Sequence, residues 1–330
     1  MTVAARPREL TVTFRSMASD VELRVVGPRP GAVAALERAA TAIRAVATHL
    51  TRFEPSSALS RANAAPSAWH LVPGELAEAV REAERAHRIT GGLFDPRVLA
   101  TLLSWGYDRT FAEVVGSESE PRDGLHRNPE RSRRVGPALV PAGPWAPVVL
   151  PSSHGGLVNL DGTAIDLGGI GKGLAVRHAA AELADAGEAV LVDAGGDEWL
   201  GGPGPDGGGW MVGVEDPHGG DAPVLVLAVT DLGCATSSIR RRHWMADGTP
   251  VHHLVDPRTG RPGGPGLASV TVLDADPAWA EVWSKTLFLA GATEVEAQAH
   301  VRGLAAAWVT EQGEVRVSAA MEPHVVWRAA

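Results

Sequence analysis

One glycine-rich stretch constrains the fold of this chain more than any other part of the sequence. It spans residues 158–173, VNLDGTAIDLGGIGKG, and runs directly into the helix-like segment LAVRHAAAELADAG. The run IDL at 165–167 predicts a short strand, the pair Gly168 and Gly169 breaks it, and Lys172 follows between two further glycines. Glycines let a ligand approach the backbone closely, and the N–H groups that open a helix favour an anion. The stretch is either a phosphate-binding turn or a plain turn from strand to helix, and it has neither P-loop nor GxGxxG spacing.

Composition and charge exclude several classes of protein. Apolar residues make up 45% of the 330 residues, charged residues 21%, and the net charge is -9. These values predict a soluble globular chain and argue against a nucleic-acid or anionic-membrane surface, which needs clustered Lys and Arg. The single cysteine, Cys234, excludes an internal disulfide and a thiolate metal cluster. The N-terminal residues lack a signal-peptide pattern, and no apolar run approaches the roughly 18 residues of a membrane span, so we expect a cytoplasmic protein without direct membrane insertion.

Hydrophobic periodicity predicts the secondary structure of most of the chain. The predicted strands are residues 10–15, 21–26, 189–196, 210–217, 224–230 and 269–273, with a hairpin formed by AAAWVT and GEVRVS; the predicted helices are residues 32–52, 74–89, 99–105 and 277–290. Residues 210–217 and 224–230 are expected in one sheet with 189–196. Because helices and strands mix without a regular βαβ alternation, the predicted fold class is α+β, with mixed sheets and packed helices.

Hydrophobic periodicity is lost between about residues 115 and 145, where charged residues alternate with Pro and Gly. We interpret residues 113–146 as a surface excursion. It divides a single domain, residues 1–330, into an N-terminal lobe at 10–112 and a C-terminal lobe at 147–330.

Polar residues at the ends of predicted strands are candidates for chemistry, because loops at strand ends commonly carry functional sites. Besides the glycine turn these are Gly195-Gly196-Asp197, the run TSS at 236–238, and HHLVDP at 252–257. An imidazole titrates near neutrality and can move a proton, although a histidine beside a strand is more often structural. The polar run after the first helix, with Ser57 and Asn63, is explained more simply by helix capping and turns than by ligand binding.

Taken together, the motifs resemble those of the ApbE family of FAD:protein FMN transferases over about residues 11–310. The matching motifs, in chain order, are Met17-Ala18-Ser19, SSALSRAN, GGLFDPRV with Trp105-Gly106-Tyr107, IDLGGIGKG, GGD at 195–197, ATSS, HHLVDPRTGRP and SVTVL. The resemblance implies the two-lobed, T-fold-related architecture of that family. It also implies transfer of FMN from FAD to a Thr or Ser hydroxyl of an acceptor flavoprotein, with Mg²⁺ present and AMP released.

The resemblance assigns roles to particular residues. It implies His253 as the general base for the acceptor hydroxyl, and Lys172 as a catalytic residue that holds the FAD phosphates with the backbone of 168–173. The residues implied in binding FAD are Met17, Asp95, Asp166, Gly168, Gly169, Lys172, Gly195, Gly196, Asp197, Thr236, His253 and Asp256. For Asp256 a role in fixing its own loop is the simpler interpretation.

The metal site is where this sequence departs from the family. The resemblance implies Mg²⁺ bound by the Gly171 carbonyl and by an Asp and a Thr that lie four residues apart. In this chain the segment AEVWSKTLFLAG has Glu281 at the Asp position and Lys285 at the Thr position. Glutamate is a hard oxygen ligand, whereas a protonated lysine cannot ligate. Three alternatives stay open: Mg²⁺ held by Glu281, water and FAD phosphates; a Lys285 ammonium standing partly in for the metal; or an ordinary i,i+4 pair on a solvated helix face. An alignment that places Thr286 at the family's threonine position would break the match between TLFLAG and the family motif.

Four functions follow from these alternatives. The leading one is the flavin transferase, with FAD and an acceptor carrying an FMN-binding domain as partners. The second is an FAD-binding module without transfer, and the third is an FAD hydrolase that gives FMN and AMP. The fourth, an unrelated nucleotide-dependent oxidoreductase, is disfavoured because no dinucleotide fingerprint is present.

Overall fold

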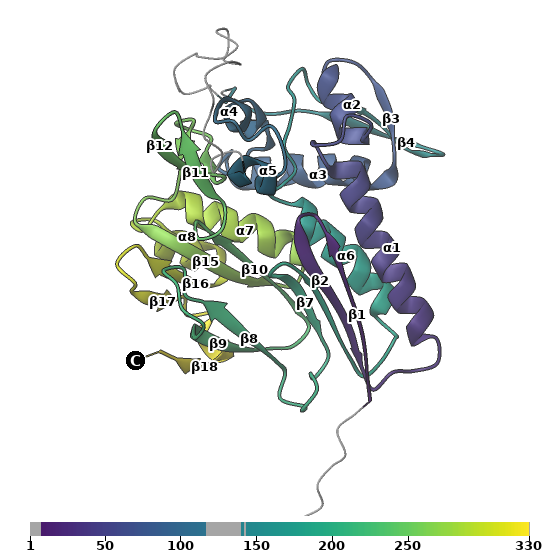
Figure 1. Cartoon of the computed structure of the whole chain (residues 1–330), viewed down its shortest axis with the longest axis vertical. Coiled ribbons are helices and arrows are strands. Elements are labelled where there is room, and N and C mark those ends of the chain that lie inside the picture. The colour runs from purple at the N-terminus through teal and green to yellow at the C-terminus, as the bar shows by residue number, and fades with distance from the viewer. Residues whose placement is uncertain (1–7, 117–139, 142, 330) are drawn as a thin grey trace, which may run out of the picture.

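The protein is built around one large antiparallel sheet, as the computed structural model shows for residues 8–116, 140–141 and 143–329 (Figure 1). The strand order is β1-β2-β6-β7-β10-β15-β16-β17. The strands are β1 (Glu9–Ser16), β2 (Ser19–Val26), β6 (Ala189–Ala194), β7 (Asp197–Gly201), β10 (Leu232–Ser238), β15 (Leu267–Asp274), β16 (Ala305–Thr310) and β17 (Val315–Val317). The predicted α+β class is confirmed, and so is the hairpin, which is β16 paired with β17.

Three helices cover one face of this sheet: α1 (Ala32–Leu50), α6 (Gly171–Leu183) and α7 (Pro277–Ala290). Helix α6 packs against both α1 and α7, and α7 lies on β10 and β15. Alternation along the strands decides which side chains meet the helices, because successive residues of a strand point to opposite faces. In β15, for example, Val270 and Val272 join the core under the helices, whereas Leu273 points to the other face.

A second, smaller sheet covers the opposite face. It contains β8 (Trp210–Glu215), β9 (Pro223–Val229) and β18 (Val325–Arg328) in the order β18-β9-β8, with η2 (Glu322–His324) leading into β18. The prediction that residues 210–217 and 224–230 share a sheet with 189–196 is therefore wrong. Alternation identifies a strand with one buried face, but it carries no information about which strand lies beside it.

Most of the remaining elements surround one end of the main sheet (Figure 1). The helices at this end are α2 (Ala58–Ala64), α3 (Gly74–Ile89), η1 (Pro96–Val98), α4 (Leu99–Ser104) and α5 (Phe111–Gly116), whereas α8 (Val295–Arg302) packs against α7. A separate three-stranded sheet contains β3 (His70–Val72), β4 (Val148–Ser152) and β5 (Gly155–Asn159) in the order β3-β5-β4. Two short hairpins pair β11 (His243–Ala246) with β12 (Thr249–His252), and β13 (Val255–Asp256) with β14 (Arg261–Pro262).

The short strand predicted at residues 165–167 is not formed, and that prediction is wrong. The segment has no regular secondary structure, and its backbone groups bond to a side chain and a loop. Asn63 of α2 accepts from the Ile165 N–H at 2.9 Å and donates to the Ile165 carbonyl at 2.8 Å, and the Asp166 N–H donates to the Pro96 carbonyl at 2.7 Å. An amide side chain thus replaces a neighbouring strand.

Most of the predicted surface excursion, residues 113–146, lies outside the described residues. At its end Trp145 is buried, and its indole N–H donates to the Leu160 carbonyl at 3.0 Å. The boundary between the two predicted lobes stays a prediction. No helix in the described part of the chain is long and apolar enough to cross a membrane.

Glycine at position 173 allows α6 and α7 to approach at backbone distance. A Cβ placed on Gly173 would lie 2.6 Å from the Ala278 Cα and 2.6 Å from the Pro277 carbonyl oxygen, both at the start of α7. Real Cβ atoms do not come this close to backbone atoms, so any other residue here must push the two helices apart.

We predict that Gly173→Ala lowers the free energy of unfolding by about 1–3 kcal/mol, because the added methyl overpacks a backbone contact. Gly74→Ala, at the first residue of α3, is the matched control, since a Cβ there meets no atom within 4 Å. Urea denaturation should show the control unchanged, or stabilised by up to about 1 kcal/mol through helix propensity. Equal behaviour of the two variants would contradict the close approach of α6 and α7.

Candidate active site

A cavity of about 710 Å³ opens where the helices and loops meet at the end of the main sheet. Its walls come from the β1–β2 turn, the end of α1 with the loop after it, the segment 93–98, the glycine turn at 166–172, and parts of β13 and α7. A cavity of this size is typical of a site for a small organic ligand or cofactor.

The cavity gathers most of the predicted site residues from distant parts of the sequence. Those that line it are Met17, Asp95, Asp166, Gly168, Gly169, Gly171, Lys172, His253 and Lys285. The predicted residues that do not line it are Gly195, Gly196, Asp197, Thr236, Asp256 and Glu281. Of the second group, Asp197 and Glu281 contact the cavity wall from behind, as the following contacts show.

Met17 reaches the cavity through a tight two-residue turn. Ser16 pairs with Ser19 across the β1–β2 hairpin, and Met17 and Ala18 both have positive φ angles, 51° and 56°. Positive φ at both central residues is the geometry of the hairpin turn that matches strand twist. Gly195 supports the same hairpin, because a Cβ on it would lie 2.5 Å from the Ser19 hydroxyl oxygen.

The backbone N–H groups of the glycine turn are largely used inside the protein. The Gly168 N–H donates to the Asp166 carboxylate at 2.8 Å, and the Gly171 N–H donates to the Leu167 carbonyl at 2.9 Å. These donors hold the turn in shape, so positive charge for an anionic ligand comes mainly from side chains.

Arg52, which our sequence analysis did not single out, fixes the glycine turn from the other side of the cavity. Its guanidinium donates to the Asp166 carboxylate at 2.6 Å and to the Tyr107 carbonyl at 2.7 Å. It also stacks on the rings of Phe53 and Tyr107, 4.3 and 4.7 Å from their centroids. The Arg52 side chain is only 6% exposed. The sequence analysis placed Arg52 at the end of the predicted helix 32–52 and gave it no role; the signal that could have found it was an arginine beside the aromatic Phe53.

Lys172 and Asp197 form a short ion pair at the start of α6. Asp197 is buried, so it neutralises the lysine from behind the cavity wall. Its neighbour Glu198 is buried among acidic groups, and burial with the charges of Asp193 and Asp197 raises the pKa of Glu198 to about 8. Asp197 is therefore the carboxylate that pairs with Lys172.

His253 is held as a neutral imidazole at the cavity. Burial, assisted by the positive charges of Arg242 and Lys285, lowers its pKa well below the ordinary value. Its Nδ1 lies 3.3 Å from the Arg242 carbonyl, which can only accept a hydrogen bond. The ring proton is therefore on Nδ1, and Nε2 carries a lone pair that can take a proton.

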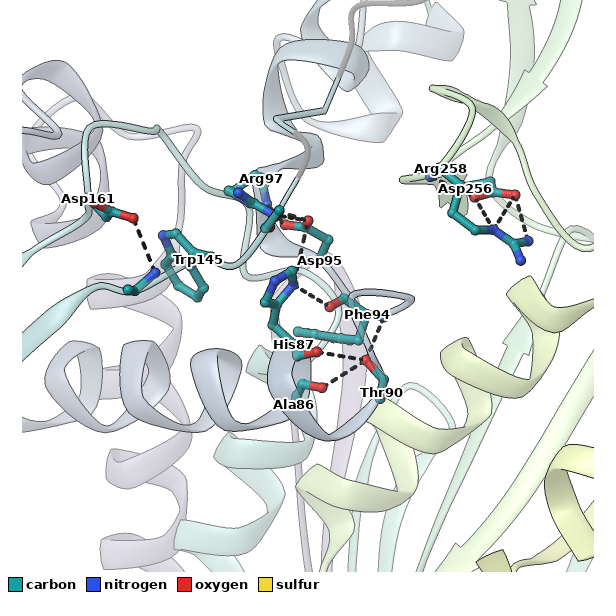
Figure 2. Close-up of polar contacts among 12 residues, drawn as sticks. Ala86, His87, Thr90, Phe94, Asp95, Arg97, Trp145, Asp161, Asp256 and Arg258 are labelled. Atoms are coloured by element: carbon teal, nitrogen blue, oxygen red, sulfur yellow. Dashed lines mark hydrogen bonds and ion pairs between the residues drawn. The ribbon is translucent and has the colours of Figure 1, made fainter. Parts of the chain in front are cut away.

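Asp95 and Asp256 occupy two copies of the same turn, Asp-Pro-Arg (Figure 2). In each copy the carboxylate accepts from the backbone N–H of the arginine, at 2.9 Å for Arg97 and 2.8 Å for Arg258, and pairs with its guanidinium. Asp95 also lies 3.5 Å from the Nδ1 of His87. Both carboxylates thus close their own loops, which for Asp256 is the simpler of the two roles expected. Thr236 shares a hydroxyl hydrogen bond of 2.8 Å with Thr271 of the next strand.

The residues at the implied metal site do not fit Mg²⁺. The Glu281 carboxylate is buried and accepts from the Gly173 N–H at 2.8 Å, and Lys285 presents an ammonium where a hydroxyl ligand is implied. Thr286 offers no substitute, because its hydroxyl is buried and donates to the Val282 carbonyl at 2.8 Å. In the part of the chain that the structure describes, no group of three His, Cys, Asp or Glu residues is arranged to hold a metal ion.

The alternative of an exposed i,i+4 pair is wrong as well. Glu281 is 5% exposed, and among the described residues no ion pair within 4 Å joins it to Lys285. Burial raises the pKa of Glu281 to about 7, opposed by Lys172 and Lys285. Burial likewise lowers the pKa of Lys285, opposed by Glu281 and Asp166.

The cavity of this α+β fold brings together two lysines, three arginines and a neutral histidine, a set of side chains suited to an anionic small molecule. The ApbE family model matches residues 17–308, so the chain belongs to the ApbE family. The chain is 30% identical over 302 residues to the FAD:protein FMN transferase of Treponema pallidum, covering 87% of this chain and 80% of that protein. The corresponding Escherichia coli protein is 28% identical over 273 residues, covering 80% and 73%. The flavin transferase ApbE from Vibrio cholerae has the same fold, with a TM-score of 0.76, 22% identity, and coverage of 96% and 99%.

We predict that the Arg52–Asp166 pair contributes strongly to stability. Removing one member of a buried pair leaves the other charge unpaired, so Arg52→Met should lower the free energy of unfolding by about 3–5 kcal/mol. Adding Asp166→Asn should recover part of that loss, which chemical denaturation of a double-mutant cycle would measure as a coupling of about 1–3 kcal/mol. The matched control is the exposed pair Arg38 and Glu182, also at 2.6 Å, where the coupling should stay below about 1 kcal/mol. Equal couplings would show that Arg52 does not fix the turn electrostatically.

Proposed function

We propose that this protein transfers FMN from FAD to a Thr or Ser hydroxyl of an acceptor protein and releases AMP. The acceptor oxygen forms a bond to the phosphorus on the FMN side of the pyrophosphate. The bond from that phosphorus to the bridging oxygen breaks, and AMP leaves with the electron pair. The hydroxyl proton passes to a base on the enzyme. Such a transfer depends on positioning and charge neutralisation more than on covalent chemistry by the protein.

The observation that carries this proposal is the neutral His253 at a cavity that both lysines and Arg242 also line. Its Nε2 is the base that takes the proton of the acceptor hydroxyl, because Nδ1–H is committed to the Arg242 carbonyl. Lys172, positioned by Asp197, contacts the FAD phosphates. Met17 and the loop of Asp95 contact the flavin and adenine parts along the cavity wall.

Magnesium, which the family resemblance implies, would neutralise phosphate charge if it were bound. Because Glu281 is engaged by α6 and Lys285 cannot ligate, we assign it no step in this protein.

The acceptor is proposed to be a flavoprotein with an FMN-binding domain, since the relatives are named for transfer of FMN to protein. FAD hydrolysis is the alternative if water reaches the phosphorus in place of the acceptor hydroxyl, and FAD binding alone is the alternative if neither does. The cytoplasmic location expected from the sequence stays a prediction.

We predict that His253→Ala strongly slows covalent flavin labelling of the acceptor, because no positioned base then takes the hydroxyl proton. The measurement is flavin fluorescence that survives denaturing electrophoresis, together with AMP release from FAD. General-base catalysis typically contributes a factor of about 10²–10⁴, so the rate should fall by that amount. His243→Ala is the matched control, an exposed histidine on the neighbouring hairpin whose change should leave the rate intact. AMP release without labelling in the unaltered protein would identify a hydrolase, and tight FAD retention with neither product would identify a binding module.

We also predict an unusual pH profile. A base loses activity where it is protonated, below its pKa, and the pKa of His253 lies well below 6.5. The kcat/KM for FAD should therefore stay level as the pH falls from about 8 to about 6.5, where an ordinary histidine would already be half protonated. Glu281, with its pKa raised to about 7, titrates in the same window, so the profile of Glu281→Gln serves as the control. A twofold loss centred on pH 6.5 in both proteins would rule out the buried neutral histidine as the base.

A further inference from the structure

Lys285 is the second lysine at the cavity, which Arg52, Arg61 and Arg242 also line, and its position is set by a glycine. A Cβ on Gly169 would lie 2.5 Å from the Lys285 Nζ and 3.0 Å from its Cε, so the lysine passes directly over the backbone of the glycine turn. Gly169 and Lys285 both line the cavity. Across the described residues, no hydrogen bond or ion pair engages the Lys285 ammonium, so it remains available to a ligand.

Position 285 carries a lysine in a chain whose basic residues are otherwise almost all arginines. The whole sequence contains only two lysines, Lys172 and Lys285, and the other 28 basic residues are arginines. Both lysines line the same cavity. An ammonium is a compact point charge, whereas the planar guanidinium is wider, so lysine is the basic side chain that best imitates a metal ion in a confined space.

The surroundings of Lys285 disfavour a metal ion beside it. Glu281, the nearest acidic residue on α7, is turned toward the first turn of α6 and accepts from Gly173. A divalent cation next to Lys285 would be repelled by the ammonium, and this repulsion is strong in a partly buried site. The positive charge that the phosphates require is present without a metal.

The geometry points to Lys285 as a built-in replacement for the metal ion, so that this protein neutralises the FAD phosphates with two lysines and cleaves FAD without a divalent cation. This inference rests on the proposed transfer of FMN from FAD. In that reaction Lys285 stabilises the negative charge that develops as the phosphorus–oxygen bond to AMP breaks. The bond changes and the proton transfer to His253 are the same as those given above.

The first experiment compares the unaltered protein in EDTA and in excess Mg²⁺, with FAD and an acceptor domain. AMP release should agree within about twofold between the two conditions. Lys285→Met should lower the rate in EDTA by about 10²–10³-fold, as expected when one electrostatic stabiliser is removed. Lys285→Thr, paired with Glu281→Asp, restores oxygen ligands and should make the rate depend on Mg²⁺. Loss of activity in EDTA and recovery with Mg²⁺ in the unaltered protein would overturn the inference.

FAD affinity tests the same inference without turnover. Quenching of flavin fluorescence should give the same dissociation constant in EDTA and in Mg²⁺ for the unaltered protein, and one about tenfold weaker for Lys285→Met. Thermal unfolding of each variant confirms that it is folded. If FAD binds but no AMP forms under any condition, the proposed function fails, while this affinity comparison still decides the role of Lys285. The inference that Lys285 replaces the metal ion would be contradicted by an FAD affinity that is unchanged in Lys285→Met. It would also be contradicted if Mg²⁺ tightened FAD binding to the unaltered protein by more than about tenfold.

Because the chain has two lysines, selective ¹³C labelling of lysine gives only two ε-methylene signals for NMR. The signal missing from Lys285→Met belongs to Lys285. It should shift when FAD is added in EDTA. A Lys285 signal that stays in place on saturation with FAD would show that the ammonium does not meet the phosphates.

Discussion

The contact between the first turn of α6 and the helix α7 determines the geometry of the candidate site. Gly173 lets the two backbones touch at Ala278, and one turn further along α7 the Glu281 carboxylate accepts from the Gly173 N–H. A further turn along, Lys285 passes over Gly169. Residues four apart lie on the same face of a helix, so this single contact places Lys285 beside the turn that carries Lys172.

Electrostatics at the cavity follow from the same contact. Glu281 compensates the positive end of α6, and Asp197 compensates Lys172. The charge left for a ligand is therefore that of Lys285 and Arg242, together with part of Lys172. On the opposite wall, Arg52 neutralises the charge of Asp166 in the same way. Arg52, Asp95, Asp166 and Lys172 each have an ion-pair partner within the protein, whereas among the described residues Lys285 and Arg242 form no ion pair within 4 Å. Such an arrangement is expected of a site that an anion completes.

The sequence predicted regular elements well and their pairing poorly. Helices at 32–52, 74–89 and 277–290 were predicted correctly, because their apolar residues recur at helical spacing and Asp276 caps the last of them. The separate sheet of β8, β9 and β18 was missed, since β18 comes from the end of the chain. The strand at 165–167 was predicted wrongly, because the side chain of Asn63 satisfies that backbone.

The sequence by itself determined the α+β class, the family and the order of the motifs, since these depend on local periodicity and on residues adjacent in the chain. Only the tertiary structure decided which candidates meet at one cavity. It placed Asp197 and Glu281 behind the wall, brought in Arg52, and showed that the carboxylates of Asp95 and Asp256 close their own turns. Above all, it showed that Lys285 and Glu281 do not form the i,i+4 ion pair that was one of the three alternatives left open by the sequence. The physical reason is that the partner of a charged side chain is chosen by packing between elements distant in the sequence, and spacing along one helix cannot specify it.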